Sequence, residues 1–337
     1  MTLNSTYLSR DQPLLVGRET EMTLMRDALA DASIGQGGVV LLAGEPGIGK
    51  TRMAEEFGRQ AAQAPAHVLW GRCYEGGSAP AFWPWLQIIR AYLRTHDVTT
   101  LLADMQSEAA YLVRLVPELG ARLPQLTSSL SPDDEQTRFY LFNSVTALLL
   151  RAAQTQPLVL ILDDLQWADT PSLLLLQFLA GEIRQTRLLV IGTYRDGEVG
   201  HDHPLVKTLA ELSRLHGVRL ITLAGLNAAD VAHFVQATTG QMPAVALLTT
   251  ILNETGGNPF FLTEVAHLLL SGGTQETSMV RPTLPPTVRG AIRQRLNRLS
   301  PHCNRLLNQA AIIGREFSLI RLARLGDLAQ DLLFSGL

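Results

Sequence analysis

The sequence predicts an α/β protein built on a five-stranded parallel sheet. Short runs rich in Val, Ile and Leu alternate with longer helical patterns through the first two thirds of the chain, which is typical of parallel strands joined by crossover helices. Each run is continuously apolar rather than alternating, as expected of strands covered on both faces. A glycine-rich segment directly follows the first run, where a strand would turn into a helix. The expected strands are 39–43, 67–70, 158–162, 188–193 and 219–223.

Length and composition exclude several classes of protein. A chain of 337 residues that is 46% hydrophobic can bury a large core and is expected to form two or three domains. The formal net charge of -3 gives no field that would hold nucleic acid, so direct DNA binding by this chain is not expected. The two cysteines, Cys73 and Cys303, lie far apart and form neither a disulfide framework nor a zinc pattern. With no apolar run long enough to cross a membrane, we expect a cytoplasmic protein.

The pattern divides the chain into four parts. Residues 1–13 are expected to be a disordered or loosely packed leader, and 14–225 the core, with a helical insert at about 76–150. The insert opens with aromatic residues, including Trp83 and Trp85, that belong to a core or an interface, and it has a polar break at 128–135. A helical lid follows at 226–275, in which Asn227 and Asn258–Pro259 would open helices. Residues 276–337 contain a linker and further helices at 288–299 and 303–313.

The strongest chemical signal is the segment Gly44, Glu45, Pro46, Gly47, Ile48, Gly49, Lys50 and Thr51, which fits the pattern GxxxxGK[ST] between a strand and a helix. Glycines let the backbone wrap around phosphate so that amide groups and the helix N-terminus point at the negative charge. Lys50 would reach the outer phosphates, and Thr51 would ligate magnesium through its hydroxyl. Only two lysines occur in the chain, Lys50 and Lys207, so a lysine at this position is informative.

A second signal is an apolar strand that ends in the paired carboxylates Asp163 and Asp164. Parallel strands deliver such groups to the ligand-binding edge of the sheet. Asp163 would hold the magnesium ion, and Asp164 would orient or deprotonate the attacking water. Because many fast ATPases carry glutamate at the second position, the shorter aspartate predicts slow hydrolysis. The alternative is a pair of acidic residues that open a turn.

A third strand ends in Thr193, Tyr194 and Arg195. If this strand lies beside the carboxylate strand, Thr193 or Arg195 would sense the terminal phosphate, and Arg195 would join Lys50, Asp163 and Asp164 as a catalytic group. The alternative for Arg195 is a surface salt bridge to Asp196 or Glu198.

Other polar residues have simpler interpretations. Asp169 is expected to cap the apolar helix that follows it, with a catalytic duty as the open alternative. His201 and His203 are interpreted as solvated loop residues because no further metal ligands lie nearby in the sequence. The C-terminal arginines are expected to line a solvated helix face rather than to bind nucleic acid, and they are Arg289, Arg293, Arg295, Arg298 and Arg305.

Five motifs together resemble one family. Val16-Gly17-Arg18-Glu19, the glycine-rich loop, Gly71-Arg72-Cys73-Tyr74-Glu75, Asp163-Asp164-Leu165-Gln166-Trp167 and Gly257-Asn258-Pro259 occur in the order seen in signal-transduction ATPases with numerous domains, the STAND class. The chain is similar in particular to the AAA-type ATPase module of large LuxR-type bacterial regulators and of related adenylate cyclase and kinase fusions. The resemblance covers about 13–325, nearly the whole chain.

The resemblance implies a P-loop NTPase core, a helical lid and the start of a winged-helix domain. It places Val16, Gly17 and Arg18 beside the adenine, and Asn258 and Pro259 in a lid element that closes on the nucleotide. Arg52, which follows Thr51, is also expected to bind the nucleotide. ATP or ADP with Mg²⁺ would be the cofactors. The implied role is a switch in transcription regulation or signal transduction, which ADP locks and which ATP and an inducer or regulatory protein release for self-association.

Two other functions stay open from the sequence. One is a scaffold that is gated by nucleotide without significant turnover. The other is an origin-recognition-like AAA ATPase that binds DNA directly, against which the weak net charge argues.

Overall fold

The computed structural model describes residues 15–76, 79–96, 102, 105, 107–119, 135–271, 303–305, 307–308 and 311. Its core is a parallel sheet of five strands, β1 (Gly38–Gly44), β2 (His67–Arg72), β3 (Leu158–Asp163), β4 (Leu188–Thr193) and β5 (Val218–Leu223), in the order β2-β3-β4-β1-β5. The predicted fold class is thus confirmed, and each predicted strand agrees with an observed one to within two residues at either end. Strand β4 lies between β1 and β3. Strand β1, which leads into the glycine-rich loop, is therefore not paired with β2, the next strand in the sequence.

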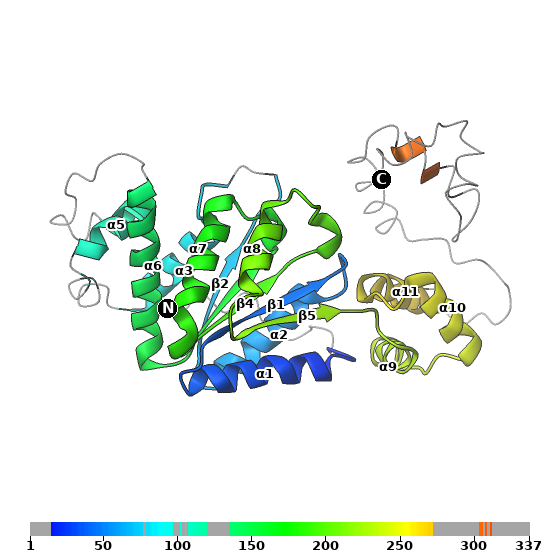
Figure 1. Ribbon diagram of the computed structural model, residues 1–337. Coiled ribbons are helices and arrows are strands. Elements are labelled where there is room, and N and C mark those ends of the chain that lie inside the picture. Colours follow the sequence, from blue (N-terminus) through cyan, green and yellow to red (C-terminus); the bar gives the residue numbers. More distant parts are fainter. Residues whose placement is uncertain are drawn as a thin grey trace. The chain divides into compact units, whose positions relative to one another are not determined.

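Helices cover both faces of the sheet (Figure 1). Alternate residues of each central strand point to opposite layers: Val40 and Leu42 pack with α1 (Glu19–Ser33) and α2 (Lys50–Gln63), whereas Val39 and Leu41 face the other layer. That second layer contains α3 (Trp83–Thr95), α5 (Ser107–Leu115), α6 (Glu135–Thr155), α7 (Thr170–Glu182) and α8 (Pro204–Leu212). Burial on both faces explains the continuous apolar runs of β1, β3 and β4.

Strand β5 departs from the expected pattern. The sequence predicts that all strands are covered on both faces, but in β5 only Ile221 and Leu223 are buried, while Leu220 is 60% exposed. The reason is that β5 is an edge strand whose buried residues pack only against the layer of α1 and α2. The apolar run at 219–223 therefore predicted the strand correctly, but it did not predict that only one face of the strand is buried.

The helical insert packs on the second layer of the core. Trp85 of α3 is completely buried, and its indole N–H donates to the backbone oxygen of Ser172 at 3.0 Å, while Trp83 packs at the margin. The prediction that these aromatic residues are core or interface residues is confirmed for Trp85. The predicted leader, most of the polar break at 128–135, the linker and the helix at 288–299 lie outside the described residues, as does part of the helix at 303–313.

After β5 the chain forms α9 (Ala228–Thr239), α10 (Val245–Thr255) and α11 (Pro259–Ser271), which we call the lid helices. Asn227 caps α9 as predicted, since its side-chain oxygen accepts the N–H groups of Ala229 and Asp230 at 2.9 and 3.0 Å.

The chain divides into two compact units with the boundary after Leu262, inside α11, and every site residue described below lies in the first unit. Short 3₁₀ segments, Pro117–Leu119, Leu165–Trp167, Ile183–Gln185 and Asp196–Glu198, complete the described elements. None of the described helices is long and apolar enough to span a bilayer.

Candidate functional site

The glycine-rich loop runs from the end of β1 to the first residue of α2. Gly47 and Gly49 have positive φ angles of 80° and 104°, which other residues rarely adopt, and this conformation brings the chain sharply into the helix. Within the described ranges, the backbone N–H groups of Gly47, Gly49, Lys50 and Thr51 have no hydrogen-bond acceptor. Unpaired amides at a helix N-terminus, beside a loop of this geometry, form a site that suits an anion such as phosphate.

The carbonyl groups of the same loop are tied to other parts of the chain. The side-chain amide of Asn258 donates to the oxygen of Pro46 at 3.1 Å, and the N–H of Phe260 donates to the oxygen of Gly47 at 3.2 Å. The guanidinium of Arg18 donates to the oxygen of Ile48 at 3.2 Å and to that of Ala224 at 2.6 Å. Three consecutive loop carbonyls are thus held by the start of α11 and by the segment before α1, while the four amides named above remain unpaired.

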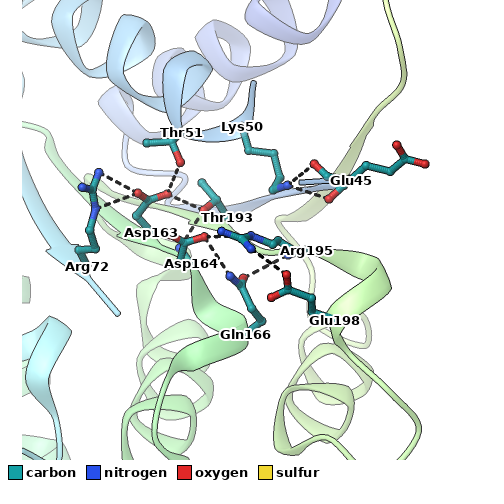
Figure 2. A network of polar contacts seen from close by, with 11 residues as sticks. Glu45, Lys50, Thr51, Arg72, Asp163, Asp164, Gln166, Thr193, Arg195 and Glu198 are labelled. Atoms are coloured by element: carbon teal, nitrogen blue, oxygen red, sulfur yellow. Dashed lines mark hydrogen bonds and ion pairs between the residues drawn. The ribbon is translucent and has the colours of Figure 1, made fainter. Parts of the chain in front are cut away.

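Lys50 ends this loop as the first residue of α2, and its side chain folds back over the loop. Its side chain is 6% exposed, and its ammonium group donates to the backbone oxygens of Gly44 and Glu45 at 2.7 and 2.8 Å (Figure 2). Burial, and to a lesser extent the nearby Arg195 guanidinium, lower the pKa of Lys50 to about 8, although the carboxylates of Asp164 and Asp163 act in the opposite direction. An ammonium held by neutral carbonyls without a direct carboxylate partner retains attraction for an incoming anion.

Asp163 is the most connected side chain of the site (Figure 2). One carboxylate oxygen, Oδ1, accepts the hydroxyl of Thr51 at 3.0 Å and that of Thr193 at 2.7 Å. The other, Oδ2, accepts Nε of Arg72 at 3.1 Å and ion-pairs with Nη2 at 3.0 Å. The group is 1% exposed, so these four contacts replace the water that it loses on folding.

Asp164 has a backbone conformation that fixes its direction. Its φ of 61° lies in the left-handed region, which costs a non-glycine residue about 1 kcal/mol or more. Its N–H donates to the Thr193 hydroxyl at 2.9 Å, and its Oδ1 accepts the amide of Gln166 at 2.9 Å. Burial raises the pKa of the Asp164 carboxyl and the charge of Asp163 adds to this, while Gln166 and Arg195 oppose it.

Arg195 ends in the same cluster. Its guanidinium pairs with Glu198 at 2.7 Å, lies 3.7 Å from Asp164 Oδ1 and stacks over the Trp167 ring at 4.5 Å. Strand β4 does lie beside β3, as the phosphate-sensing hypothesis requires. The salt bridge to Glu198, which was the alternative, is also present, so both interpretations find the geometry they need.

These contacts gather most of the predicted site residues at the carboxyl edge of the sheet. Residues 44–51, Asp163, Asp164, Thr193, Arg195, Arg18 and Asn258 form one connected cluster. Val16 is buried, and Gly17 packs so closely on Asp230 that an added Cβ would lie 2.4 Å from its carboxyl carbon. Arg52 pairs with Glu55 along α2 at 3.7 Å, and Pro259 is the first residue of α11. The roles assigned to these four residues and to the rest of the cluster remain predictions.

Residues 14–191, just over half of the chain, match the family model described as the AAA ATPase domain. The chain belongs to this family.

The curated relative that this AAA ATPase domain matches is distant. An uncharacterized protein of Rhizobium meliloti (strain 1021) is 25% identical over 194 residues, which is 54% of this chain and 18% of that protein. The chain thus spans less than a fifth of the length of this relative.

Among solved structures, the Walker-type ATPase of Pyrococcus abyssi is 15% identical with a TM-score of 0.51, over 94% of this chain and 91% of that one. This likeness shows the fold. A signal transduction ATPase with numerous domains and a tetratricopeptide repeat sensor, from Pyrococcus horikoshii, is 16% identical with a TM-score of 0.46, over 96% of this chain and 39% of that one. The Aeropyrum pernix Orc1 protein in complex with DNA is 15% identical with a TM-score of 0.45, over 95% and 79%.

The donor set of the AAA ATPase domain fits a magnesium nucleotide. Thr51 and Asp163 bring a hydroxyl and a carboxylate together at 3.0 Å, and hard oxygen donors of this kind suit Mg²⁺. No group of three or more His, Cys, Asp or Glu is gathered for a metal ion in the described part of the chain. Magnesium at nucleotide sites needs only one or two protein ligands, because phosphate oxygens and water supply the rest.

The interpretation of one histidine changes. His203 is half-buried rather than a solvated loop residue: Nδ1 accepts the N–H of Leu205 at 3.1 Å, which caps α8, and Nε2 lies 2.9 Å from the backbone oxygen of Gln166. The neighbouring His201 is exposed, as predicted. Asp169 caps α7 as predicted through Ser172, and it also accepts the N–H of Phe82 at 3.3 Å, so both of its oxygens serve structural contacts.

Sequence reasoning missed two residues of the site. Arg72 was noticed only as part of a family motif, and Gln166 only as a neighbour of the carboxylates. The signal for Arg72 was available, since it directly follows an apolar run and the carboxyl ends of parallel strands meet at one edge. For Gln166 no local signal exists, because its role depends on the turn that Asp164 makes.

The lowered pKa of Lys50 predicts a pH dependence of ATP binding. Lys50 is charged below about pH 8 in the free protein. A bound polyphosphate would raise its pKa, so binding takes up a proton once the pH exceeds the free pKa. The affinity for ATP should hold from pH 7 to 8 and then fall by up to about tenfold per pH unit.

Isothermal titration calorimetry between pH 7 and 9.5 measures this dependence. The terminal phosphate is already ionised there, since its last pKa is roughly 6. Lys207→Ala is the matched control, because it removes the chain's other, exposed lysine and should keep the same slope. An affinity that does not change above pH 8 would contradict the assignment.

Proposed function

We propose that this AAA ATPase domain is the nucleotide-binding module of a signal-transduction switch of the STAND class. It binds Mg-ATP or Mg-ADP at Lys50, Thr51 and Asp163, hydrolyses ATP slowly, and passes the state of the site to the lid helices. The module belongs to a larger bacterial regulator, as in LuxR-type proteins. The inducer and the output of that regulator depend on other segments or on partners.

One observation carries the proposal: the loop that would hold the phosphates is hydrogen-bonded directly to the start of α11. Asn258 is 4% exposed and bridges the carbonyl of Pro46 and the N–H of Phe260, at 3.1 Å each. Gly47 and Phe260 are so close that a Cβ on Gly47 would lie 2.7 Å from Cβ of Phe260. A rearrangement of this loop on binding or losing a phosphate must therefore alter these contacts.

The coupling follows from the planarity of the peptide group. Each loop peptide bonded through its oxygen to Asn258, Phe260 or Arg18 keeps its neighbouring N–H groups in a defined direction. Phosphate that binds these N–H groups polarises the same chain of hydrogen bonds and strengthens it. A ligand shifts a conformational equilibrium only by its differential affinity for the two states, and here the same loop contacts both ligand and lid.

The backbone is tightly packed where Gly257, before α11, meets Leu226, before α9, and we call this contact the lid junction. It leaves little freedom for partial movement. Gly257 has a φ of 73°, its oxygen accepts the N–H of Leu226 at 2.8 Å, and an added Cβ would lie 2.1 Å from the oxygen of Leu226. A side chain at this position would push the turn between α10 and α11 away from the segment that joins β5 to α9. A close-packed junction of this kind favours two discrete arrangements over gradual change.

Asp164 supports slow hydrolysis. A carboxyl with a raised pKa accepts a proton more readily and so suits a general base. Its Oδ1, however, already accepts the Gln166 amide and faces the Arg195 guanidinium, and its side chain is one methylene shorter than glutamate. These contacts also favour the second candidate, a nucleotide-gated scaffold without significant turnover.

The switch predicts that Asn258 transmits the difference between ATP and ADP. In the wild type, hydrogen exchange of α9 and α10 should be slower with one nucleotide than with the other. Asn258→Ala removes two hydrogen bonds at the junction, each contributing roughly 1 kcal/mol, and should abolish the difference while nucleotide still binds.

Asn227→Ala is the matched control, because it removes an asparagine cap from α9 without touching the loop. It should raise exchange at the start of α9 and keep the nucleotide difference. A difference that persists in Asn258→Ala, or that is absent from the wild type, would argue against the switch.

Phosphate release separates the slow ATPase from the scaffold. The wild type should release phosphate slowly but measurably above background, and Asp164→Asn should fall to background because an amide cannot take up the proton. Asp202→Asn, at a fully exposed aspartate, should keep the wild-type rate. Equal rates in the wild type and Asp164→Asn would remove the enzymatic role and leave the scaffold.

A further inference from the structure

Asp163 has a cationic partner in addition to its hydroxyl donors. Thr51 and Thr193 supply neutral hydrogen bonds to Oδ1, whereas Nε and Nη2 of Arg72 approach Oδ2 at 3.1 and 3.0 Å. Among the described residues, Arg72 forms the only ion pair with this carboxylate. A carboxylate that is 1% exposed is strongly destabilising unless an opposite charge lies against it.

The backbone of Arg72 is fixed while its charged end reaches solvent. Arg72 is the last residue of the edge strand β2, directly opposite Asp163 in the register. The amide of Gln87, on α3, pairs with both backbone groups of Arg72, at 2.9 and 3.3 Å. The guanidinium side chain is nevertheless 47% exposed, so it can leave the carboxylate for water without a change in the strand.

We propose that Arg72 is the built-in counter-ion of Asp163 when no divalent cation is bound, and that it competes with magnesium for this carboxylate. Arg72 thereby sets the magnesium concentration at which the nucleotide is held. This inference rests on the proposed function, because it assumes that Asp163 serves a magnesium nucleotide. A guanidinium and a metal ion have the same sign of charge, so each weakens the binding of the other to one negative group.

An ordinary surface salt bridge would not have this effect. Exposed ion pairs contribute little, because both partners are well solvated when separated. Here only one partner is exposed, and removing the arginine leaves a buried charge without compensation. Removing Arg72 should therefore destabilise the magnesium-free protein and at the same time strengthen magnesium binding. If Arg72 only oriented Asp163, its removal would not strengthen magnesium binding.

The first arm of the test measures the magnesium dependence of ATP binding. Radiolabelled ATP at a fixed low concentration is retained in equilibrium dialysis while MgCl₂ is raised, and formation of Mg-ATP in solution is the same for every variant. In Arg72→Gln the half-saturating MgCl₂ concentration should fall roughly three- to tenfold, and the effect should shrink at high KCl. Arg72→Lys, which keeps the charge, should stay near the wild type.

Arg90→Gln is the matched control. Arg90 lies on α3, pairs with Glu118 at 2.7 Å and carries the same charge without contacting Asp163, so its loss should leave the midpoint unchanged. Gln87→Ala is a second variant that keeps the charge of Arg72 but frees its backbone, and it should lower the midpoint by roughly twofold. An unchanged or raised midpoint in Arg72→Gln and Gln87→Ala would overturn the inference.

The second arm needs no nucleotide. In EDTA, thermal unfolding of Arg72→Gln should occur several degrees below that of the wild type, and Arg90→Gln should unfold close to the wild type. Equal melting of Arg72→Gln and the wild type would also overturn the inference. Wild-type protein that retains no ATP at any MgCl₂ concentration would overturn the proposed function together with it, whereas normal binding with an unshifted Arg72→Gln midpoint would overturn the inference alone.

Discussion

The buried carboxylate of Asp163 is the constraint on which the rest of the site depends. One charged group, 1% exposed, joins the first turn of α2 through Thr51, the end of β4 through Thr193 and the end of β2 through Arg72. Because an ionised carboxylate cannot be buried without such partners, the ends of these elements are held at fixed distances from one another. The glycine-rich loop then has a rigid support on one side, and Asn258 with Arg18 hold it on the other.

The arrangement separates two tasks that one loop performs. Three of its carbonyls accept hydrogen bonds from other parts of the chain, whereas four of its amides stay available for an anion. Lys50 adds a buried ammonium whose partners are neutral carbonyl oxygens rather than carboxylates, so its charge is not cancelled within the loop. Membership of the AAA ATPase domain family agrees with this chemistry. What the lid helices do with the signal is the proposed part of the account, and it depends on contacts of Asn258 and Phe260 with the loop.

The sequence was sufficient for the parts of the site that are local. The loop from Gly44 to Thr51 has a spacing that only a strand, a tight glycine turn and a helix satisfy, and Asp163 follows an apolar strand directly. Caps such as Asn227 and Asp169 were equally readable, because the capping side chain and the helix it opens are adjacent. The two-sided burial expected of β5 failed, since an apolar run does not reveal whether its strand lies at an edge.

Contacts between elements far apart in the sequence were beyond such reasoning. The insertion of β4 between β1 and β3 decides that Thr193 reaches Asp163, and no local pattern states the strand order. The ion pair of Arg72 depends on the register of two strands that are about ninety residues apart, and the contact of His203 with Gln166 depends on the left-handed turn at Asp164. Tertiary packing, rather than propensity, sets these positions.

The central claim is that Lys50, Thr51 and Asp163 hold a magnesium polyphosphate at the carboxyl edge of the sheet. Calorimetric titration of the folded protein with ATP and MgCl₂, beside the same titration of Lys50→Ala, tests it most directly. The account predicts saturable heat for the wild type and its loss in a Lys50→Ala variant that keeps the wild-type circular dichroism spectrum. No heat from the folded wild type, or the same affinity in both proteins, would contradict the claim.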